Sequence, residues 1–421
     1  MSSARGVAAV AVYAALLLLG LCAASHAVWP PWLAQDDLEP VYPDVTASVD
    51  DVRALAGRRD VVLIDARRRS AYADGHIPGA VSMPPPNEFP GDGIPVADLP
   101  AVLGAVGLSG GSSYVCYGDD TYSDAAAYAF WLLEAGGAER VKLLDGGYQA
   151  WLDVGGSADT EPHRLTPTAW TAEPVDSLFA PLDYILGQYG IRGYEIIDVR
   201  SRRAWAEGHI PHALHFDATA MLESGMLLPP EECREIFSVT GPRPASPVRL
   251  GDEFIVHGDG VDDGAMGYFL LRRAGVADVL YYPGGWGRWR DDGTLPIVRF
   301  IGGEELNELV SRGNRWPWQD APPESFVLID VRHEGDYANG HIPGSVVLTS
   351  RLFADSLDVV LERHWPNIDR ETTPIVTYCY GPTCIRSRHT STDAARAGFL
   401  RIWRFYGGLE EWREVGGRVA K

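Results

Sequence analysis

The chain repeats one set of motifs three times, and this repetition constrains the fold more than any other feature. Each copy has an Asp-x-Arg tripeptide whose Asp lies eleven residues before the His of a Gly-His-Ile-Pro tetrapeptide. The tripeptides are Asp65 to Arg67, Asp198 to Arg200 and Asp330 to Arg332, and the histidines are His76, His209 and His341. A Gly-Gly pair closes each copy, with Trp151, Trp289 or Trp412 five residues after its first glycine. Chance does not produce this pattern, so we predict three homologous modules.

Within each module, segments typical of strands alternate with segments typical of helices. In the third copy, an amphipathic helix at 303–311 precedes an apolar strand at 326–330 and the Gly-His-Ile-Pro turn. A second strand at 345–348, a variable segment, a strand ending at Tyr378, a helix and a short strand before Gly-Gly follow. This alternation predicts α/β modules, each a mainly parallel sheet flanked by helices. Such sheets bind ligands beyond the carboxyl ends of their strands.

Composition sets the expected boundaries. Polar stretches that contain proline, near 155–174 and 291–299, are interpreted as linkers. The predicted organisation is a signal peptide at 1–27, a lead-in rich in Pro and Trp at 28–44, and modules at 45–157, 175–298 and 299–421. Each module is long enough to bury a core of its own.

The N-terminus has the pattern of a secretory signal. Arg5 precedes an apolar run at 6–22, and the small residues at 23–27 suit cleavage after Ala27. We expect an exported protein, periplasmic in a bacterium with two membranes, without stable membrane association after cleavage. The alternative is a retained N-terminal membrane anchor, because the apolar run approaches the length that spans a bilayer.

The charge of the chain limits its partners. The formal net charge is −21. Nucleic acids and anionic membrane surfaces repel such a protein, so we expect no nucleic-acid partner. The acidic residues are otherwise interpreted as a solvated surface.

Cys379 is the candidate nucleophile. It follows an apolar strand and precedes a Gly/Pro loop and a predicted helix, where backbone N–H groups lower the pKa of a thiol and stabilise its thiolate. The aligned positions in the first two modules hold Gly118 and Gly258, followed by Asp119 and Asp259. Only the third module is therefore expected to carry the chemistry.

Features that all three modules share are attributed to the fold. Asp330, Arg332 and His341 are accordingly interpreted as structural, with a catalytic role for His341 as the alternative. Cys116 and Cys233 are interpreted as buried, unreactive thiols.

The repeated Asp-x-Arg, Gly-His-Ile-Pro and Gly-Gly-x-x-x-Trp motifs resemble those of the rhodanese family of sulfurtransferases, over nearly all of the chain after the signal. Three modules behind an export signal, with the cysteine in the last one, resemble the three-domain periplasmic rhodaneses of Gram-negative bacteria. The resemblance implies that Cys379 takes sulfane sulfur from a small anionic donor such as thiosulfate. It then passes this sulfur, held as a persulfide, to cyanide, a thiol or a partner protein. No cofactor other than the persulfide and no metal are expected.

The loop after Cys379 is the predicted substrate-binding segment, and it departs from the family pattern. Its residues are Tyr380, Gly381, Pro382, Thr383, Cys384, Ile385, Arg386 and Ser387. Their backbone N–H groups are expected to cradle the sulfur, with positive charge from Arg386. Arg388 is either a second loop cation or a solvated charge. Arg386 lies seven residues after the cysteine instead of the common five, and Asp336 stands where members specialised for thiosulfate can have an arginine, so the donor stays open.

Three alternatives remain at this point. Cys384 is either a spectator or a redox partner that forms a disulfide with Cys379. A phosphatase or arsenate reductase would need five residues between its cysteine and arginine, whereas six separate Cys379 from Arg386. A non-catalytic sulfur carrier or docking protein is the other competing function. In each case the first two modules either shape the cleft or bind partners.

Overall fold

The computed structural model describes residues 43–55, 57–83, 96–189, 194–240, 253–276, 278–312, 326–382, 384 and 386–421. All of them belong to the unit Pro40–Lys421. The predicted signal peptide at 1–27 and the lead-in up to residue 42 lie outside the described residues. In the described part of the chain, no helix combines the length and apolar character needed to cross a membrane.

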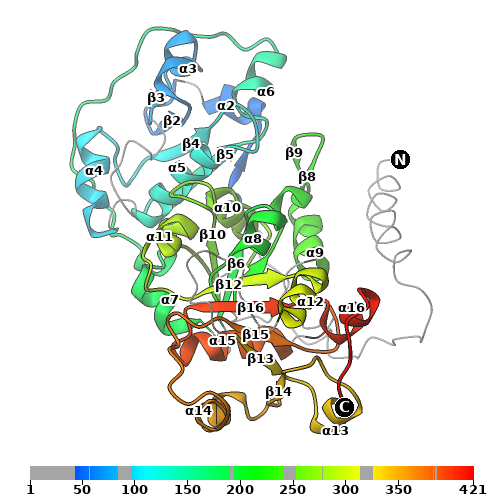
Figure 1. Ribbon diagram of the computed structural model, residues 1–421. Coiled ribbons are helices and arrows are strands. Elements are labelled where there is room, and N and C mark those ends of the chain that lie inside the picture. The colour runs from blue at the N-terminus through cyan, green and yellow to red at the C-terminus, as the bar shows by residue number, and fades with distance from the viewer. Residues whose placement is uncertain are drawn as a thin grey trace, which may run out of the picture. The chain divides into compact units, whose positions relative to one another are not determined.

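The first module is a five-stranded parallel sheet in the order β1-β5-β4-β2-β3 (Figure 1). Its strands are β1 (Thr46–Ala47), β2 (Val61–Asp65), β3 (Val81–Ser82), β4 (Ser113–Tyr117) and β5 (Arg140–Leu144). Its helices are α2 (Val49–Leu55), α3 (Arg69–Asp74), η3 (Val96–Asp98), α4 (Leu99–Ala105), α5 (Asp124–Ala135) and α6 (Gly147–Asp153).

The second module has a four-stranded parallel sheet in the order β11-β10-β6-β7, with a small antiparallel hairpin of β8 and β9. The strands are β6 (Tyr194–Asp198), β7 (Leu214–His215), β8 (Leu222–Glu223), β9 (Met226–Leu227), β10 (Glu253–His257) and β11 (Val279–Tyr281). The helices are η4 (Asp176–Leu178), α7 (Leu182–Gln188), α8 (Arg202–Glu207), η5 (Ala218–Met221), α9 (Pro230–Thr240), α10 (Ala265–Arg273) and α11 (Gly285–Asp291).

The third module repeats the topology of the first, in the order β12-β16-β15-β13-β14. Its strands are β12 (Ile297–Ile301), β13 (Val327–Asp330), β14 (Val346–Val347), β15 (Ile375–Tyr378) and β16 (Arg401–Phe405). Its helices are α12 (Gly303–Ser311), α13 (Glu334–Asn339), α14 (Phe353–His364), α15 (Arg386–Arg396) and α16 (Gly408–Glu414). The predicted α/β fold of three parallel-sheet modules is confirmed.

Every residue of β13 and β15 is buried, as expected for central strands covered on both faces. Residues of these strands alternate between two cores. One core contains α14 and α15, and the other contains α12 and α16. Figure 1 shows α15 beside β15 and β16, which it contacts. The sheet therefore presents the carboxyl end of β15 between these two layers.

The closing tryptophans have the same function in each module. Each indole Nε1 donates to a backbone carbonyl a few residues further along the chain: Trp151 to Ser157 at 2.8 Å, Trp289 to Pro296 at 2.9 Å and Trp412 to Arg418 at 3.0 Å. The ring fills the core while its polar atom is satisfied. This pairing explains why a tryptophan closes every copy.

The first two modules share one hydrophobic core, built around α5 and α10. The rings of Phe130 and Phe269 meet edge to face, with their centroids 5.1 Å apart. Beside them, the Tyr268 hydroxyl donates to Glu134 at 2.8 Å. These contacts join the two modules through buried apolar surface.

The second and third modules are joined by a buried ion pair. Nη2 of Arg388, on α15, donates to Oε2 of Glu195 at 2.7 Å and to the carbonyl oxygen of His212 at 3.1 Å. The side chains of Arg388 and Glu195 are 10% and 2% exposed. Arg388 is therefore neither a solvated charge nor a loop cation, and both expectations for it were wrong.

Two expected boundaries also differ from the structure. The break placed at 298/299 falls inside β12, because this strand begins at Ile297 and pairs with β16 of the third module. The stretch interpreted as a linker at 155–174 packs on the first module. Its Trp170 is buried and donates to Gly136 at 2.8 Å, and the backbone of Asp159 pairs with that of His76.

The buried ion pair leads to a stability prediction. Glu195→Ala leaves Arg388 buried without the carboxylate that it binds. We therefore expect the free energy of unfolding of the second and third modules to fall by about 3–5 kcal/mol. The matched control is Glu207→Ala, which removes an exposed partner of Arg203 and should cost at most about 1 kcal/mol. Urea denaturation followed by tryptophan fluorescence measures both. Equal losses in the two variants would contradict the prediction.

Candidate active site

Cys379 is the first residue beyond the carboxyl end of β15, a strand in the interior of its sheet. The backbone N–H groups of Leu409 and Glu410 donate to the carbonyls of Cys379 and Tyr380 at 3.1 and 3.0 Å. Gly408, with φ of +59°, allows this approach, since a Cβ there would lie 2.6 Å from the Cys379 carbonyl oxygen. The start of α16 thus holds the cysteine in place.

The structure contains a disulfide between Cys379 and Cys384, with their Cα atoms 6.2 Å apart. The N–H of Cys384 donates to the carbonyl of Gly381 at 3.0 Å, which closes a tight turn between the two cysteines. Cys379 itself is 1% exposed. In this oxidised form its sulfur is not a free thiolate, and reduction must precede any nucleophilic chemistry.

The other loop residues occupy different environments. Gly381 and Ser387 are buried, Pro382 is exposed, and Arg386 is the first residue of α15. The carbonyl of Ser387 accepts from the hydroxyl of Thr377 at 3.3 Å, which ties the helix to β15. Two further predicted loop residues, Thr383 and Ile385, lie outside the described residues.

Tyr380 lies at the centre of a polar network at the mouth of the loop. Its hydroxyl donates to Oδ2 of Asp336 at 2.5 Å, and the Arg386 guanidinium lies 5.8 Å from its ring centroid. Nη2 of Arg386 is 3.4 Å from Nε2 of His333. Asp336, noted in the sequence as a departure from the family pattern, thus orients the residue next to the cysteine. We did not predict the contact of His333 with Arg386 from the sequence. The aligned positions of the first two modules hold Arg68 and Ser201, so the histidine is specific to the third module.

The Asp-x-Arg motif forms a buried clamp. Nε and Nη2 of Arg332 donate to the carboxylate of Asp330 at 3.0 and 2.6 Å, and Nη2 also donates to the carbonyl of Gly340 at 2.7 Å. The first two modules contain the same contacts, with Gly75 and Gly208 as the carbonyl partners. This repetition supports a structural role, because two of the three modules have a glycine where the third has Cys379.

The histidine of the Gly-His-Ile-Pro turn is also held the same way three times. Nδ1 of His341 lies 3.0 Å from the carbonyl oxygen of Tyr337, and the two rings stack with centroids 3.8 Å apart. His76 and His209 make the corresponding contacts at 2.8 Å. These contacts favour the structural interpretation of His341 over a catalytic one.

The strand register shows which positions of the other modules are equivalent to Cys379. The aspartate of each Asp-x-Arg motif pairs with the last residue of the neighbouring strand, which is Tyr117, His257 or Tyr378. The next residues in the chain are therefore equivalent, and they are Gly118, Gly258 and Cys379.

The thiols of Cys116 and Cys233 are buried in their modules. Burial raises the pKa of the Cys116 thiol, and it raises the pKa of Cys233 to about 11. Neither is poised to react as a thiolate.

Comparison with known proteins identifies the family. Residues 48–153, 183–292 and 314–415 match the Rhodanese-like domain, so the chain belongs to the rhodanese family. It is 28% identical over 266 residues to the thiosulfate sulfurtransferase of Azotobacter vinelandii, a match that covers 59% of this chain and 94% of that protein. The thiosulfate sulfurtransferase of Pseudomonas aeruginosa is 25% identical over 274 residues, covering 61% and 98%. The chain is therefore an enzyme of the sulfurtransferase class.

Two further similarities extend this comparison. The sulfur carrier protein TtuD of Thermus thermophilus is 27% identical over 300 residues, covering 63% of this chain and 99% of that one. Among solved structures, an anaerobic ergothioneine biosynthesis enzyme from Chlorobium limicola is similar with a TM-score of 0.52 at 19% identity, covering 63% of this chain and 73% of that one. The structural similarity shows the shared fold.

The contact between Tyr380 and Asp336 leads to a testable pH effect. Burial and the negative charge of Asp336 raise the pKa of the Tyr380 hydroxyl, while Arg386 lowers it. We expect Asp336→Asn to lower the pKa of Tyr380, because an amide no longer repels the phenolate. The alkaline absorbance titration of each protein, minus that of its Tyr380→Phe derivative, isolates this group. An unchanged or raised pKa would contradict the assigned contact.

Proposed function

We propose that this enzyme moves sulfane sulfur from a small anionic donor such as thiosulfate to a thiophilic acceptor, through a persulfide on Cys379. One observation carries the proposal. Of three equivalent strand-end positions, one holds a nucleophile and the other two hold Gly118 and Gly258. The names of the relatives support the donor class.

The reaction takes two displacements. The Cys379 thiolate attacks the outer sulfur of thiosulfate, the sulfur–sulfur bond of the donor breaks, and sulfite leaves with the bonding electron pair. Cyanide or a thiolate then attacks the outer sulfur of the persulfide, and the Cys379 thiolate is regenerated. The electrons balance without an external oxidant, and we propose no cofactor besides the persulfide. Such a covalent intermediate gives ping-pong kinetics.

The loop residues have distinct roles in this proposal. Backbone N–H groups from Tyr380 to Ser387 cradle the persulfide sulfur, and Arg386 supplies positive charge at the mouth for an anionic donor. Asp336 adds a negative charge at the same place, which weakens the attraction for a dianion. Asp330, Arg332 and His341 hold the strand end and do not take part in the transfer.

Cys384 is proposed as a redox partner. The disulfide with Cys379 occupies the nucleophile, so the oxidised enzyme is inactive until a dithiol reduces it. The two cysteines are five positions apart in one loop of the third module. The switch is therefore local and reversible.

A second candidate function is a sulfur carrier, which would hold the persulfide for a protein partner without rapid turnover. The similarity to the sulfur carrier protein TtuD favours it.

We also propose that the chain is exported and loses residues 1–27, with a retained anchor as the alternative. The N-terminal sequence of the protein recovered from the periplasmic fraction tests this proposal.

The persulfide proposal predicts a mass change. Reduced protein incubated with thiosulfate should gain the mass of one sulfur atom, and Cys379→Ser should abolish the gain because the nucleophile is lost. Cys116→Ser and Cys233→Ser are matched controls at buried thiols and should retain it. Intact-protein mass spectrometry measures all four proteins. A gain that survives Cys379→Ser would refute the assignment, and a persulfide that does not turn over with cyanide or thiols would favour the carrier.

The proposed redox role predicts a difference between two proteins. The thiol oxidant diamide should abolish thiosulfate:cyanide activity in the wild type, and dithiothreitol should restore it. Cys384→Ser cannot form the loop disulfide, so it should keep most of its activity under the same treatment. Steady-state rates before and after each treatment provide the measurement. Equal inactivation of both proteins would show that Cys384 is a spectator.

A further inference from the structure

Arg404 is a buried cation where the third module meets the second. It lies on β16, is 5% exposed, and pairs in register with Phe300 of β12 and Thr377 of β15. Its guanidinium lies 5.3 Å from the ring centroid of Phe300, and that ring packs edge to face on Trp205 of the second module. Residues paired across parallel strands share one face of the sheet. Arg404 therefore lies on the face that the second module contacts.

The described residues supply no carboxylate to balance this charge. Nε of Arg404 has no hydrogen-bond partner among them, and no acidic side chain is among the groups that shift its pKa. Burial and the neighbouring cation Arg388 lower the pKa of Arg404 to about 9, whereas Tyr406 raises it. The guanidinium is therefore still charged at pH 7. A buried charge without a partner is costly, so a charge from outside the described chain is expected to compensate it.

The polar neighbours of Arg404 at the junction do not provide that compensation. Glu195 faces the junction, but its carboxylate binds Arg388 at 2.7 Å. Burial lowers the pKa of His209 to about 3 and that of His212 well below its usual value, and the charge of Arg404 adds to both effects. Both imidazoles are neutral at pH 7. Two guanidinium groups thus share one carboxylate, and the junction keeps an excess positive charge.

The arginine is specific to the third module. Counted back from the closing Gly-Gly pair, the same position holds Leu143 in the first module and Tyr281 in the second. Both are buried, and the hydroxyl of Tyr281 donates to the carbonyl of Val261 at 2.8 Å. The repeated fold therefore accepts an apolar or a self-satisfied side chain at this position, and it does not require a charge.

A second residue at the junction also departs from the repeat. His212 takes the place of Gly79 and Gly344 in the Gly-His-Ile-Pro-Gly turn, and it keeps their left-handed backbone, with φ of +72°. This conformation is unfavourable for a residue other than glycine. Its imidazole Nδ1 lies 3.4 Å from the hydroxyl of Thr392 on α15, and its carbonyl accepts from Arg388. Two positions of the repeat have thus become polar at one junction.

We propose that this junction binds a small oxyanion, such as sulfate or thiosulfate, through the guanidinium of Arg404. The planar fork of N–H donors matches two oxygens of such an anion, and the negative charge of the anion balances the excess positive charge. Tyr406, two residues further along the same face, is 39% exposed, so the site lies one residue below the surface. The bound anion stabilises the packing of the third module on the second. The site is independent of the persulfide mechanism.

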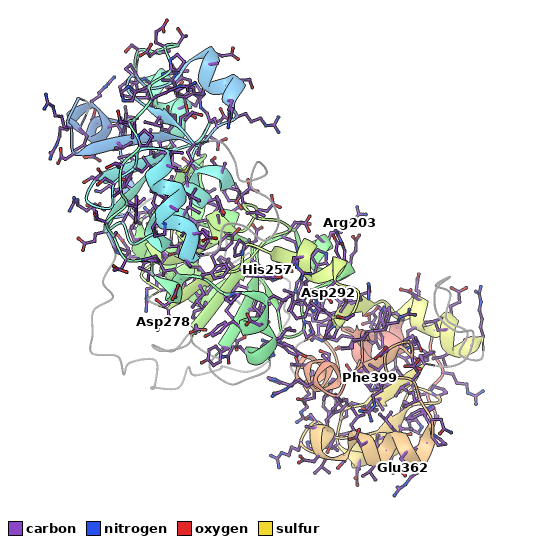
Figure 2. All side chains as sticks on the ribbon, turned by 90° about the vertical axis from the view of Figure 1, so that its left-hand side faces the viewer. Arg203, His257, Asp278, Asp292, Glu362 and Phe399 are labelled. Carbon is purple, nitrogen blue, oxygen red and sulfur yellow. A yellow bond between two sulfur atoms is a disulfide. The ribbon has the colours of Figure 1, made fainter. Side chains whose placement is uncertain are left out.

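The first experiment measures how anions affect unfolding. Sulfate at roughly a hundredfold above its dissociation constant should raise the unfolding midpoint of the second and third modules by about 5 °C or more. Arg404→Leu introduces the side chain of Leu143 and should remove this shift. The control Arg203→Leu removes an arginine that is 88% exposed on α8 and should retain it (Figure 2). Scanning calorimetry at millimolar sulfate, with chloride at equal ionic strength as the reference, provides the measurement. An equal rise in chloride, or in Arg404→Leu, overturns the site.

The same variant separates an anion site from an internal structural contact. Without an oxyanion, Arg404→Leu should unfold at the temperature of the wild type or above it, because an apolar side chain replaces a buried charge without a partner. A marked fall in its unfolding temperature would show that the chain itself satisfies Arg404, and it would overturn the proposal.

A comparison of anions identifies the ligand. Sulfate, phosphate and thiosulfate are compared in Cys379→Ser, which cannot take up sulfur. Equal shifts with all three support a general oxyanion site, and a shift that is largest with thiosulfate supports a site for the sulfur donor. No shift with any of them overturns the proposal.

The position of the anion is tested by crystallography. Wild-type crystals soaked in selenate, an analogue of sulfate with a strong anomalous signal, should show an anomalous peak within hydrogen-bond distance of a nitrogen of Arg404. The absence of a peak there overturns the site, even if Arg404→Leu fails to fold. Failure of the site leaves the proposed sulfur transfer intact, and failure to detect a persulfide on Cys379 leaves the anion site intact.

Discussion

The buried bridge between Asp330 and Arg332 is the interaction on which the Cys379 edge of the third module depends. The carboxylate is held at the end of β13, and the guanidinium extends from it to the carbonyl of Gly340, so one arginine fixes a strand end and the following turn together. Both groups are almost fully buried, which is tolerable because the bridge is bidentate and the remaining donor of Nη2 is used. The adjacent strand β15 then ends in register with this bridge, which places Cys379 at the same edge.

The sequence was sufficient for the fold because the repeated motifs depend on local spacing. The clamp residues are two positions apart, and the closing tryptophan bonds to a carbonyl six or seven residues away, so each repeat carries its own signature. The misjudged features depend on contacts distant in sequence. Arg388 pairs with Glu195, 193 residues earlier, and nothing in the neighbouring residues of either indicates the partner. The predicted module boundary fell inside β12 for the same reason, since the strand that pairs with it, β16, lies about a hundred residues later.

The first two modules take part in the architecture around Cys379. The first shares its core with the second, and the second receives Arg388 from α15, the helix that begins at the end of the loop after Cys379. Breaking a buried charge pair is costly, so α15 is fixed relative to β6 of the second module. The loop is thereby held from both sides, by α16 of its own module and by a helix anchored on its neighbour. This arrangement gives the second module a structural reason to be present, whether or not it also binds a partner.

The loop after Cys379 connects a disulfide to a polar network at its outer end. In the oxidised structure the sulfur of Cys379 is bonded to Cys384, and the hydroxyl of the next residue, Tyr380, is bonded to Asp336. Availability of the Cys379 thiolate is thus governed by a bond within the loop. Tyr380 adjoins Cys379, and its ring centroid lies 5.6 Å from the Arg332 guanidinium. In the first two modules an aspartate holds the position of Tyr380, and it lies 3.7 or 3.8 Å from Nη1 of the Asp-x-Arg arginine. The third module therefore covers this arginine with a tyrosine ring instead of a carboxylate, and it is the module that carries Cys379.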